Sequence, residues 1–470
     1  MNVLLVSTYE LGHQPFGLAS PAAWLRQAGF TVTCLDLSRE PLTSAPVEQA
    51  AFIAFYLPMH TATRLAIQVL PEIRKLNSSA HLCFYGLYAA PNAHFLRQSG
   101  AQTILGGEFE AELVQAAERV RDEGANGFAS STSMARLDFI PPDRQGLPSL
   151  GRYARLELPD GTSRIAGYTE ASRGCKHLCR HCPVVPVYNG RFRIVAPEVV
   201  LEDVRCQVGA GAQHITFGDP DFFNGIRHAV RVITDLHRQF PNLSYDATIK
   251  IEHLLKHREH LGTLRDTGCL FVTSAVESVD ERVLERLEKG HTAADFRRVA
   301  GLFREAGLAL SPTFVAFTPW ISLEGYAELL DTIAGLDLID NVASVQLGIR
   351  LLIPAGSRLL EREDVRALVK PFDASGLVYP WNHPDDRVGK LYREVQRVIR
   401  SGIRSHHSRR EIFDAVRKTA RRAAGVPDPI GAAAHLGERG PIPYLSEPWY
   451  CCAEPAGDEL AQAAGAGPGV

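Results

Sequence analysis

The sequence of 470 residues predicts an α/β protein with a doubly wound N-terminal domain, a second unit of repeating βα elements and a helical C-terminal region. Two observations predict this class. Short apolar runs alternate with helix-like patterns in two separate parts of the chain, which is typical of parallel sheets covered by helices. A stretch rich in turn-forming residues separates the two parts.

Residues 1–125 contain the first alternation. Strands are expected at "NVLLVST", "TVTCLDL", "AAFIAFYLP" and "AHLCFYG", with helices at "SPAAWLRQAG" and "TATRLAIQVLPEIRKL". This order predicts a Rossmann-like sheet, and such sheets bind ligands beyond the carboxyl ends of their strands. We therefore expect a ligand crevice near "STYELGHQPFG", "LPMHTAT", "YGLYAAPN" and "LGGEFEAE".

Residues 126–165 are predicted to be a linker, and the second alternation occupies residues 166–365. Its strands are expected at "HITFGDPD", "LSYDATIKI", "CLFVTSAVES", "LALSPTFVAF" and "VASVQLGIRLLI". Sequential βα units with right-handed crossovers close into a full or partial barrel whose site lies at the carboxyl ends of the strands. Residues 366–440 are predicted to be helical, and residues 441–470 form a tail that carries two adjacent cysteines.

The composition indicates a soluble globular protein that binds small molecules. It is 45% hydrophobic and 22% charged with a net charge of −3, so no charge excess would attract nucleic acid or an anionic membrane. The start, "MNVLLVSTYELG", lacks the features of a secretory signal, and no apolar run reaches the roughly 18 residues of a membrane span. We expect a cytoplasmic protein whose nine cysteines are reduced.

Three cysteines follow the first strand of the second unit, in "RGCKHLCRHC": Cys175, Cys179 and Cys182. A tetrahedral zinc or a plain electron-transfer cluster needs four protein ligands, and no fourth cysteine follows nearby. Three thiolates can instead hold three irons of a [4Fe–4S] cluster, leaving the fourth iron for a cofactor with its own donors. The alternative is a zinc site completed by His177 or His181.

The spacing of these cysteines resembles the signature of the radical S-adenosylmethionine (SAM) superfamily, whose members contain a partial barrel, here of the (β/α)6 type. The resemblance implies a [4Fe–4S] cluster on the three cysteines, with SAM chelating the open iron through its amine and carboxylate. It also implies an external electron donor such as flavodoxin or ferredoxin, because one electron splits a C–S bond of SAM into a carbon radical.

The resemblance implies further cofactor contacts at the ends of the following strands. The stretch "FGDPDF" is expected to contact the SAM amine, "TIKIE" and "AVESVD" its ribose and carboxylate, and the residue before the last cysteine its adenine. Because "FGDPD" replaces the Gly-Gly-Glu pattern common in the family, the resemblance leaves open which of the two aspartates holds the amine. The cofactor-binding residues implied in this way are His181, Asp219, Asp221, Lys250, Glu277 and Ser278. Helix caps and solvated ion pairs remain the alternative explanation of these positions.

The N-terminal domain followed by the cysteine loop resembles the cobalamin-binding branch of this superfamily. The Asp-x-His-x-x-Gly stretch with which many cobalamin domains ligate cobalt is missing, although "ELGHQPFG" contains His13 and a second strand end carries His60. The resemblance therefore leaves open whether the domain binds cobalamin or keeps only the fold.

The tail contains adjacent cysteines, Cys451 and Cys452, in "PWYCCAEP". A disulfide between neighbours is strained, whereas two soft thiolates chelate thiophilic centres such as As(III). The tail resembles that of the CUAEP/CCAEP radical SAM proteins, in which some members carry selenocysteine at the position of Cys452. This implies a catalytic role for both cysteines, and the alternative is an incidental surface pair.

Together these features predict a radical SAM transferase. The predicted reaction moves a SAM-derived carbon group, with 3-amino-3-carboxypropyl as the candidate, to a soft thiol-bound substrate such as arsenite, as in organoarsenical biosynthesis of the arsinothricin type. Two alternatives remain at this point: a cobalamin-dependent radical SAM methyltransferase, and a zinc or electron-transfer module without turnover.

Overall fold

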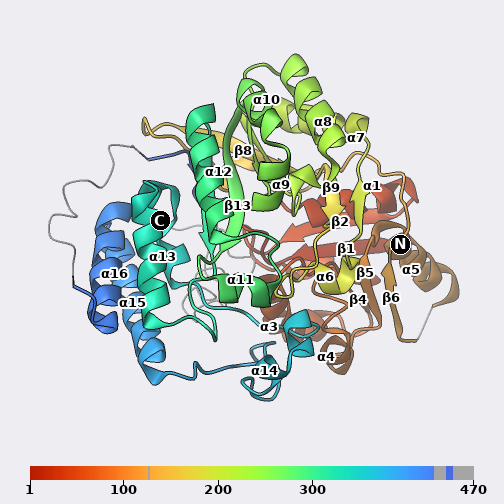
Figure 1. The fold of residues 1–470 in the computed structure, drawn as a ribbon. Coiled ribbons are helices and arrows are strands. Elements are labelled where there is room, and N and C mark those ends of the chain that lie inside the picture. The colour runs from red at the N-terminus through yellow and green to blue at the C-terminus, as the bar shows by residue number, and fades with distance from the viewer. Residues whose placement is uncertain (125–126, 428–440, 448–470) are drawn as a thin grey trace.

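A computed structural model describes residues 1–124, 127–427 and 441–447 of the chain (Figure 1). It contains two mainly parallel sheets covered by helices, and a C-terminal pair of long helices. This is the predicted α/β architecture. Within the described residues, no helix combines the length and the apolar character needed to cross a membrane.

The first sheet is parallel and has the strand order β2-β1-β3-β4-β5-β6. Its strands are β1 (Asn2–Ser7), β2 (Thr31–Asp36), β3 (Phe52–Tyr56), β4 (His81–Tyr85), β5 (Thr103–Gly107) and β6 (Ala129–Ser133). Its helices are α1 (Phe16–Gln27), α2 (Ser44–Gln49), α3 (His60–Leu76), α4 (Ala93–Gln98) and α5 (Glu110–Glu123). Alternate residues of each strand face opposite ways, so Val3 packs with α1 and α5 whereas Leu4 packs with α2, α3 and α4.

Strand β6 lies in the stretch expected to be a linker. Its sequence, "ASSTS", contains no large apolar residue, yet it pairs in parallel with β5 from Thr103 to Gly107. An edge strand with partly exposed faces is held mainly by backbone pairing and needs few apolar side chains. For this reason the composition of β6 did not indicate a strand.

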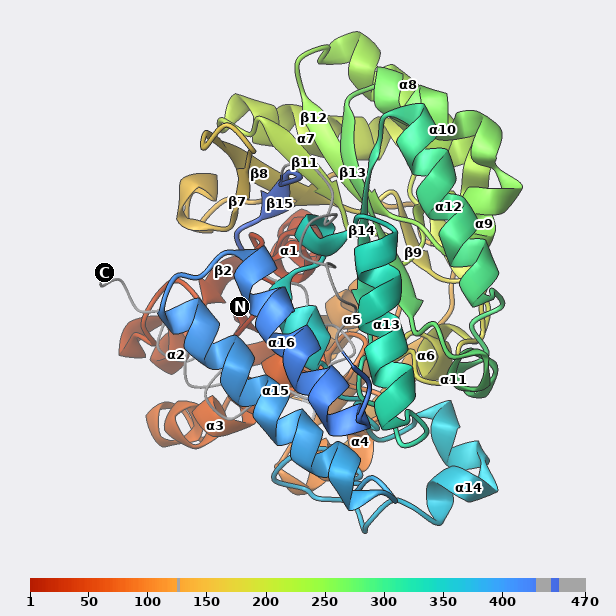
Figure 2. The ribbon, with the colours of Figure 1, turned by 60° about the vertical axis from the view of Figure 1, so that its left-hand side comes forward.

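The second sheet has the order β14-β13-β12-β11-β8-β7-β15, and it is curved (Figure 2). Its strands are β7 (Arg155–Glu157), β8 (Ser163–Thr169), β11 (His214–Phe217), β12 (Ser244–Thr248), β13 (Cys269–Glu277), β14 (Ala309–Phe314) and β15 (Tyr444–Leu445). The helices of this unit are α7 (Pro197–Gly209), α8 (Ile226–Gln239), α9 (Ile251–Lys256), α10 (Leu261–Asp266), α11 (Glu281–Leu287), α12 (Ala293–Ala306) and α13 (Leu323–Gly335).

The stretch "VASVQLGIRLLI" was expected to be a further strand of the barrel. It forms a 3-10 helix over Ser344–Gly348 and a single bridge between Phe317 and Arg350 instead. The side chain of Gln346 accepts a hydrogen bond from the Phe314 backbone N–H at 3.2 Å, so a side chain occupies a donor that a sixth strand would have paired.

The C-terminal region contains α14 (Glu363–Arg366), α15 (Asp386–Arg404) and α16 (Arg409–Ala424). The described chain then resumes as a short strap, residues 441–447, whose strand β15 pairs antiparallel with β7. The Tyr9 hydroxyl donates to Glu447 Oε1 at 2.6 Å, so the strap joins the second sheet to the loop after β1.

The two sheets meet at a buried arginine on a short hairpin of β9 (Ser172–Gly174) and β10 (Phe192–Ile194). Arg173 forms ion pairs of 2.7 Å with Glu110 and with Glu170, and a longer one of 3.4 Å with Glu108. Burial raises the pKa of Glu108 to about 7, although the guanidinium of Arg173 opposes this. One cation therefore holds three carboxylates from both units.

Replacing this cation should destabilise the fold in a pH-dependent way. We expect Arg173→Met to lower the free energy of unfolding by about 3–5 kcal/mol, because it leaves the buried carboxylates unpaired. Burial already raises the pKa values of Glu108 and Glu170, and removal of the opposing guanidinium would raise them further above the unfolded values. Folding then takes up protons, so the loss should be larger at pH 8 than at pH 6. Urea denaturation at both pH values measures the loss of unfolding free energy, and Arg397→Met, at an exposed position, is the control. An equal loss at pH 6 and pH 8 would contradict the role of Arg173 as the counter-ion of these carboxylates.

Candidate functional site

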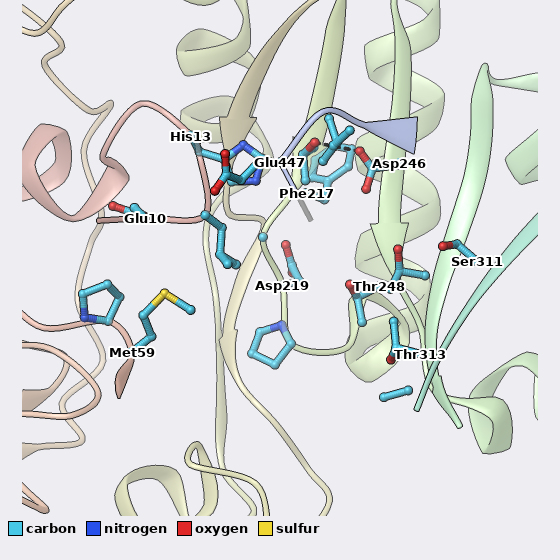
Figure 3. A pocket seen from close by; sticks show the side chains of 18 of the residues that line it. Glu10, His13, Met59, Phe217, Asp219, Asp246, Thr248, Ser311, Thr313 and Glu447 are labelled. Atoms are coloured by element: carbon cyan, nitrogen blue, oxygen red, sulfur yellow. Dashed lines mark hydrogen bonds between the residues drawn. The ribbon is translucent and has the colours of Figure 1, made fainter. Parts of the chain in front are cut away.

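One cavity of about 820 Å³ lies where the carboxyl ends of both sheets face each other (Figure 3). On the first sheet, Glu10, Tyr56, Met59 and Phe109 contribute to its wall, at the crevice expected from the strand order. The second sheet contributes polar side chains from β11 to β14, and the strap adds Glu447. The cavity is therefore shared by both units.

All three cysteines of the hairpin loop line this cavity. Cys175 and Cys179 are buried, and Cys182 is partly buried. Burial raises the pKa of the Cys175 thiol to about 11. The ammonium of Lys250 lies 3.7 Å from Cys179 Sγ, a cation beside a sulfur that must become a thiolate to bind metal.

The structure also gathers a second group of possible ligands around Cys175. Its sulfur, a ring nitrogen of His177 and a carboxylate oxygen of Asp221 all lie within 4.8 Å of one another. His181, the other histidine expected as a zinc ligand, points its Nε2 at Glu277 Oε1 at 3.0 Å. Of the two histidines, only His177 thus stands with a cysteine in a possible metal site.

Glu277 occupies a strained position at the end of β13. Its φ is +68°, and the Ser278 N–H donates to Val276 O at 2.9 Å, the bonding of a classic γ-turn. The turn brings the carboxylate to His181 and to the ammonium of Lys289, 3.3 Å away. Although burial opposes it, the Lys289 charge lowers the pKa of Glu277 to about 2.

Asp219 follows β11 and its side chain lines the cavity. Its Oδ1 accepts from the Ser172 hydroxyl at 2.5 Å and its Oδ2 from the Ala171 N–H at 2.9 Å, so it also fixes the start of the cysteine hairpin. Burial raises the pKa of Asp219 to about 7, and the two hydrogen bonds only partly offset this. Its carboxyl therefore changes charge close to neutral pH.

Asp221 and Ser278 lie beside the cavity rather than in its wall. Asp221 Oδ2 lies 2.7 Å from His253 Nδ1 and 3.4 Å from His177 Nε2. Burial opposes ionisation, but these two histidines hold the pKa of Asp221 well below its usual range. Ser278 is buried and its hydroxyl accepts from the Asp280 N–H. The six predicted cofactor residues thus fall into two groups. Four of them line the cavity, whereas Asp221 and Ser278 do not; the four are His181, Asp219, Lys250 and Glu277.

Several groups that line the cavity were not predicted from the sequence. Lys289 is one, because nothing in "LEKGHT" marks it as the partner of Glu277. Asp246 on β12 is another: its Oδ1 accepts from Thr216 at 2.7 Å and contacts His214 Nε2 at 2.9 Å. Polar Ser244, Asp246 and Thr248 alternate with Tyr245 and Ala247 along β12. This period of two could have predicted from the sequence that one face of the strand lines a polar interior.

The two N-terminal histidines have different surroundings. His13 lines the cavity, with its ring centre 4.7 Å from that of Tyr168, and burial lowers the pKa of His13 to about 4. His60 Nε2 hydrogen-bonds to Gly376 O at 2.7 Å. Cys451 and Cys452 lie outside the described residues.

Comparison with known families identifies the second unit. Residues 169–334 match the Radical SAM superfamily. The chain contains a radical SAM domain. The cofactors of this superfamily are a [4Fe–4S] cluster and SAM, as the resemblance implied, and the three thiols in one cavity fit the cluster.

Curated relatives of the chain include enzymes named for tRNA and ribosomal protein modification. A tRNA-2-methylthio-N(6)-dimethylallyladenosine synthase of Desulfosudis oleivorans is 27% identical over 210 residues, which are 43% of this chain and 44% of the relative. Ribosomal protein uS12 methylthiotransferase RimO of the same organism is 24% identical over 216 residues, covering 44% of this chain and 47% of RimO. The chain spans less than half the length of these relatives.

Solved structures share the two-unit fold. The cobalamin-dependent SAM radical enzyme OxsB, with aqua-cobalamin and SAM bound, superposes with a TM-score of 0.67 at 15% identity, covering 86% of this chain and 67% of OxsB. The radical SAM methyltransferase TsrM of Kitasatospora setae gives a TM-score of 0.58 at 17% identity, covering 72% and 71%. The predicted arrangement of a Rossmann-like unit, a partial barrel and a helical region is confirmed.

The contact between Glu277 and Lys289 should be measurable as a coupling energy. We expect Glu277→Gln to lower the free energy of unfolding by about 3–5 kcal/mol, because a buried ammonium loses its counter-ion. The double variant Glu277→Gln/Lys289→Gln should recover part of this loss. Urea denaturation of the four proteins in the cycle measures the coupling, and additive losses would contradict a direct ion pair.

Of the two aspartates expected near the SAM amine only Asp219 lines the cavity, and we propose that it receives the SAM ammonium. Its raised pKa then predicts a pH-dependent affinity for SAM. Below about pH 7 the empty site carries a neutral carboxyl and loses the ion pair, so the dissociation constant for SAM should rise as the pH falls from 8 to 6. Equilibrium dialysis of the cluster-containing protein measures it. Asp219→Asn should bind weakly at both values, and an unchanged pH profile in this variant would contradict the role.

Proposed function

We propose that this protein is a radical SAM transferase whose acceptor binds in the cavity between the two sheets. One observation carries the proposal. The three cysteines of the radical SAM domain line the same cavity as the residues of the crevice of the first sheet. A carbon radical formed from SAM beside the cysteine loop would therefore share this cavity with an acceptor bound at the crevice or the strap.

In this proposal the residues around the loop have distinct tasks. Cys175, Cys179 and Cys182 hold the cluster, which supplies the electron that splits SAM. Asp219 receives the SAM ammonium, and Lys250 neutralises charge next to Cys179, 3.7 Å away. Glu277 acts as a positioning residue, since its carboxylate binds His181 of the loop and Lys289 together.

The acceptor we propose is a soft substrate such as arsenite, held by Cys451 and Cys452. The strap supports this, because its last described residue, Glu447, lines the cavity and is bonded to Tyr9. Cys451 follows Glu447 by four residues, which span at most about 14 Å when extended. Only three residues thus separate Glu447 from Cys451 in the sequence. An As(III) centre bound by two thiolates keeps a lone pair that can trap a carbon radical.

The test is anaerobic incubation of the reduced, reconstituted protein with SAM, with and without arsenite, followed by mass spectrometry. Transfer of the 3-amino-3-carboxypropyl group predicts methylthioadenosine as the co-product, whereas hydrogen abstraction would give 5′-deoxyadenosine. Arsenite affinity should fall at least tenfold, about 1.4 kcal/mol, in both Cys451→Ser and Cys452→Ser. The exposed Cys206→Ser is the matched control; unchanged affinity in both tail variants would remove arsenite from the proposal.

A second candidate is a cobalamin-dependent radical SAM methyltransferase, favoured by the fold shared with OxsB and TsrM. Phe16, Tyr56, Met59 and Phe109 give this part of the cavity an apolar wall, which would suit the apolar face of a corrin ring. His13 lies in this wall as a neutral imidazole, a form able to ligate metal. Corrinoid that copurifies after growth with cobalamin, and methyl transfer in the same assay, would favour this candidate.

The third alternative, a zinc or electron-transfer module, differs in composition. It predicts zinc on the three cysteines, completed by His177 or His181, and a spectrum that does not respond to SAM. The short distances between Cys175 and His177 favour His177 as the fourth ligand. About four irons per chain with a SAM-dependent spectral change excludes it.

A further inference from the structure

A partly apolar, positively charged patch covers the outside of the cysteine loop. Leu178 and Ile194 are 38% and 47% exposed, and large hydrophobic side chains with this exposure are few in the described part of the chain. Three basic side chains stand near them. We define the Leu178 face as Lys176, Leu178, Arg191, Ile194 and Arg358.

Contacts make these residues one continuous surface. Gly190, next to Arg191, packs on Leu178, since a Cβ there would lie 3.3 Å from Leu178 Cδ2. The Lys176 ammonium lies 4.8 Å from the centre of the Phe192 ring, two residues before Ile194. Arg358 Nη1 donates to Leu178 O at 3.1 Å and holds the tip of the loop in place.

The face carries positive charge that its neighbours do not neutralise. Among the described residues no carboxylate lies within ion-pair distance of Lys176 or Arg191, while Arg358 pairs with Glu361 at 3.1 Å. The whole chain has a net charge of −3, so this local excess runs against the average. A charged face of this kind raises the rate at which an oppositely charged protein associates.

We propose that the Leu178 face docks a small acidic protein that carries single electrons. This rests on the proposed function, which consumes an electron at the cluster. Leu178 directly precedes Cys179, so a partner on this face stands one residue from a cluster ligand, and electron-transfer rates fall steeply with distance. One electron leaves the reduced carrier and enters the oxidised cluster, with no bond or proton changed.

The composition of the face suits a brief encounter between redox proteins. Such complexes use small interfaces, below about 1,200 Å² in total, with an apolar centre and a charged rim. Leu178 and Ile194 provide the apolar part and the three basic residues the rim. Helix α15 also exposes basic residues, such as Arg393 and Arg397, but Figures 1 and 2 place it away from β9 and α6 (Val185–Tyr188), which flank the loop.

The experiment compares two reductants of the cluster-containing protein in stopped-flow absorbance. One is reduced flavodoxin, an acidic carrier, and the other is reduced methyl viologen, a small cation that gains nothing from a basic face. The double variant Lys176→Glu/Arg191→Glu should slow reduction by flavodoxin, and weaken its binding, about tenfold at low salt. Reduction by methyl viologen should not slow. The wild-type rate with flavodoxin should fall steeply as salt rises.

Two further variants complete the test. Arg397→Glu on α15 makes the same type of charge change away from the loop and should leave both rates unchanged. Ile194→Ser should weaken flavodoxin binding with little dependence on salt. The proposal is overturned if the double variant reacts with flavodoxin like the wild type, or if an RNA oligonucleotide competes for the face and flavodoxin does not bind. Failure of SAM cleavage after methyl viologen reduction would instead count against the proposed function alone.

Discussion

The ion pairs of Arg173 join the two units around the cavity. This guanidinium lies two residues before Cys175. It contacts one carboxylate between β8 and β9 and two at the junction of β5 and α5, so the cysteine loop and the Rossmann-like crevice share one anchor. Three carboxylates around one cation would leave a net negative charge in the interior. Burial favours the neutral acid form and raises the pKa of Glu108, which reduces this charge. The mutual position of cluster loop and crevice depends on this arrangement.

The loop is held from the cavity side as well. Asp219 fixes the residues that lead into it, and Glu277 reaches His181 from a left-handed backbone position that a non-glycine residue rarely adopts. Backbone strain of this kind persists only where neighbouring groups stabilise it. At Glu277 the ammonium of Lys289 does so by binding the carboxylate. Groups that stiffen the loop thus surround it on the inside, whereas its outer tip at Leu178 remains open to a partner.

The polar interior of the second sheet separates this barrel from one filled by branched apolar side chains. Asp246, Thr216 and Thr248 face the cavity where a closed barrel would carry valine or isoleucine, and an enclosed polar space invites a polar ligand. The strap closes one side of this space through Tyr9 and Glu447, and it leads directly to the segment with the adjacent cysteines. Acceptor and cofactor would therefore enter a common chamber.

The sequence alone determined the features that depend on local order: two alternations of strand and helix, and three cysteines whose spacing places them on one loop. It also predicted that Asp219 and Glu277 lie at the site, and both line the cavity: Glu277 ends β13 and Asp219 follows β11 by two residues. Only the tertiary structure decided their partners. Lys289 meets Glu277 through a γ-turn, Arg173 meets Glu108 from 65 residues away, and β6 pairs by its backbone despite a linker-like composition. Periodicity and spacing report what neighbouring residues do together, whereas buried charge pairs form between segments that only the folded chain brings into contact.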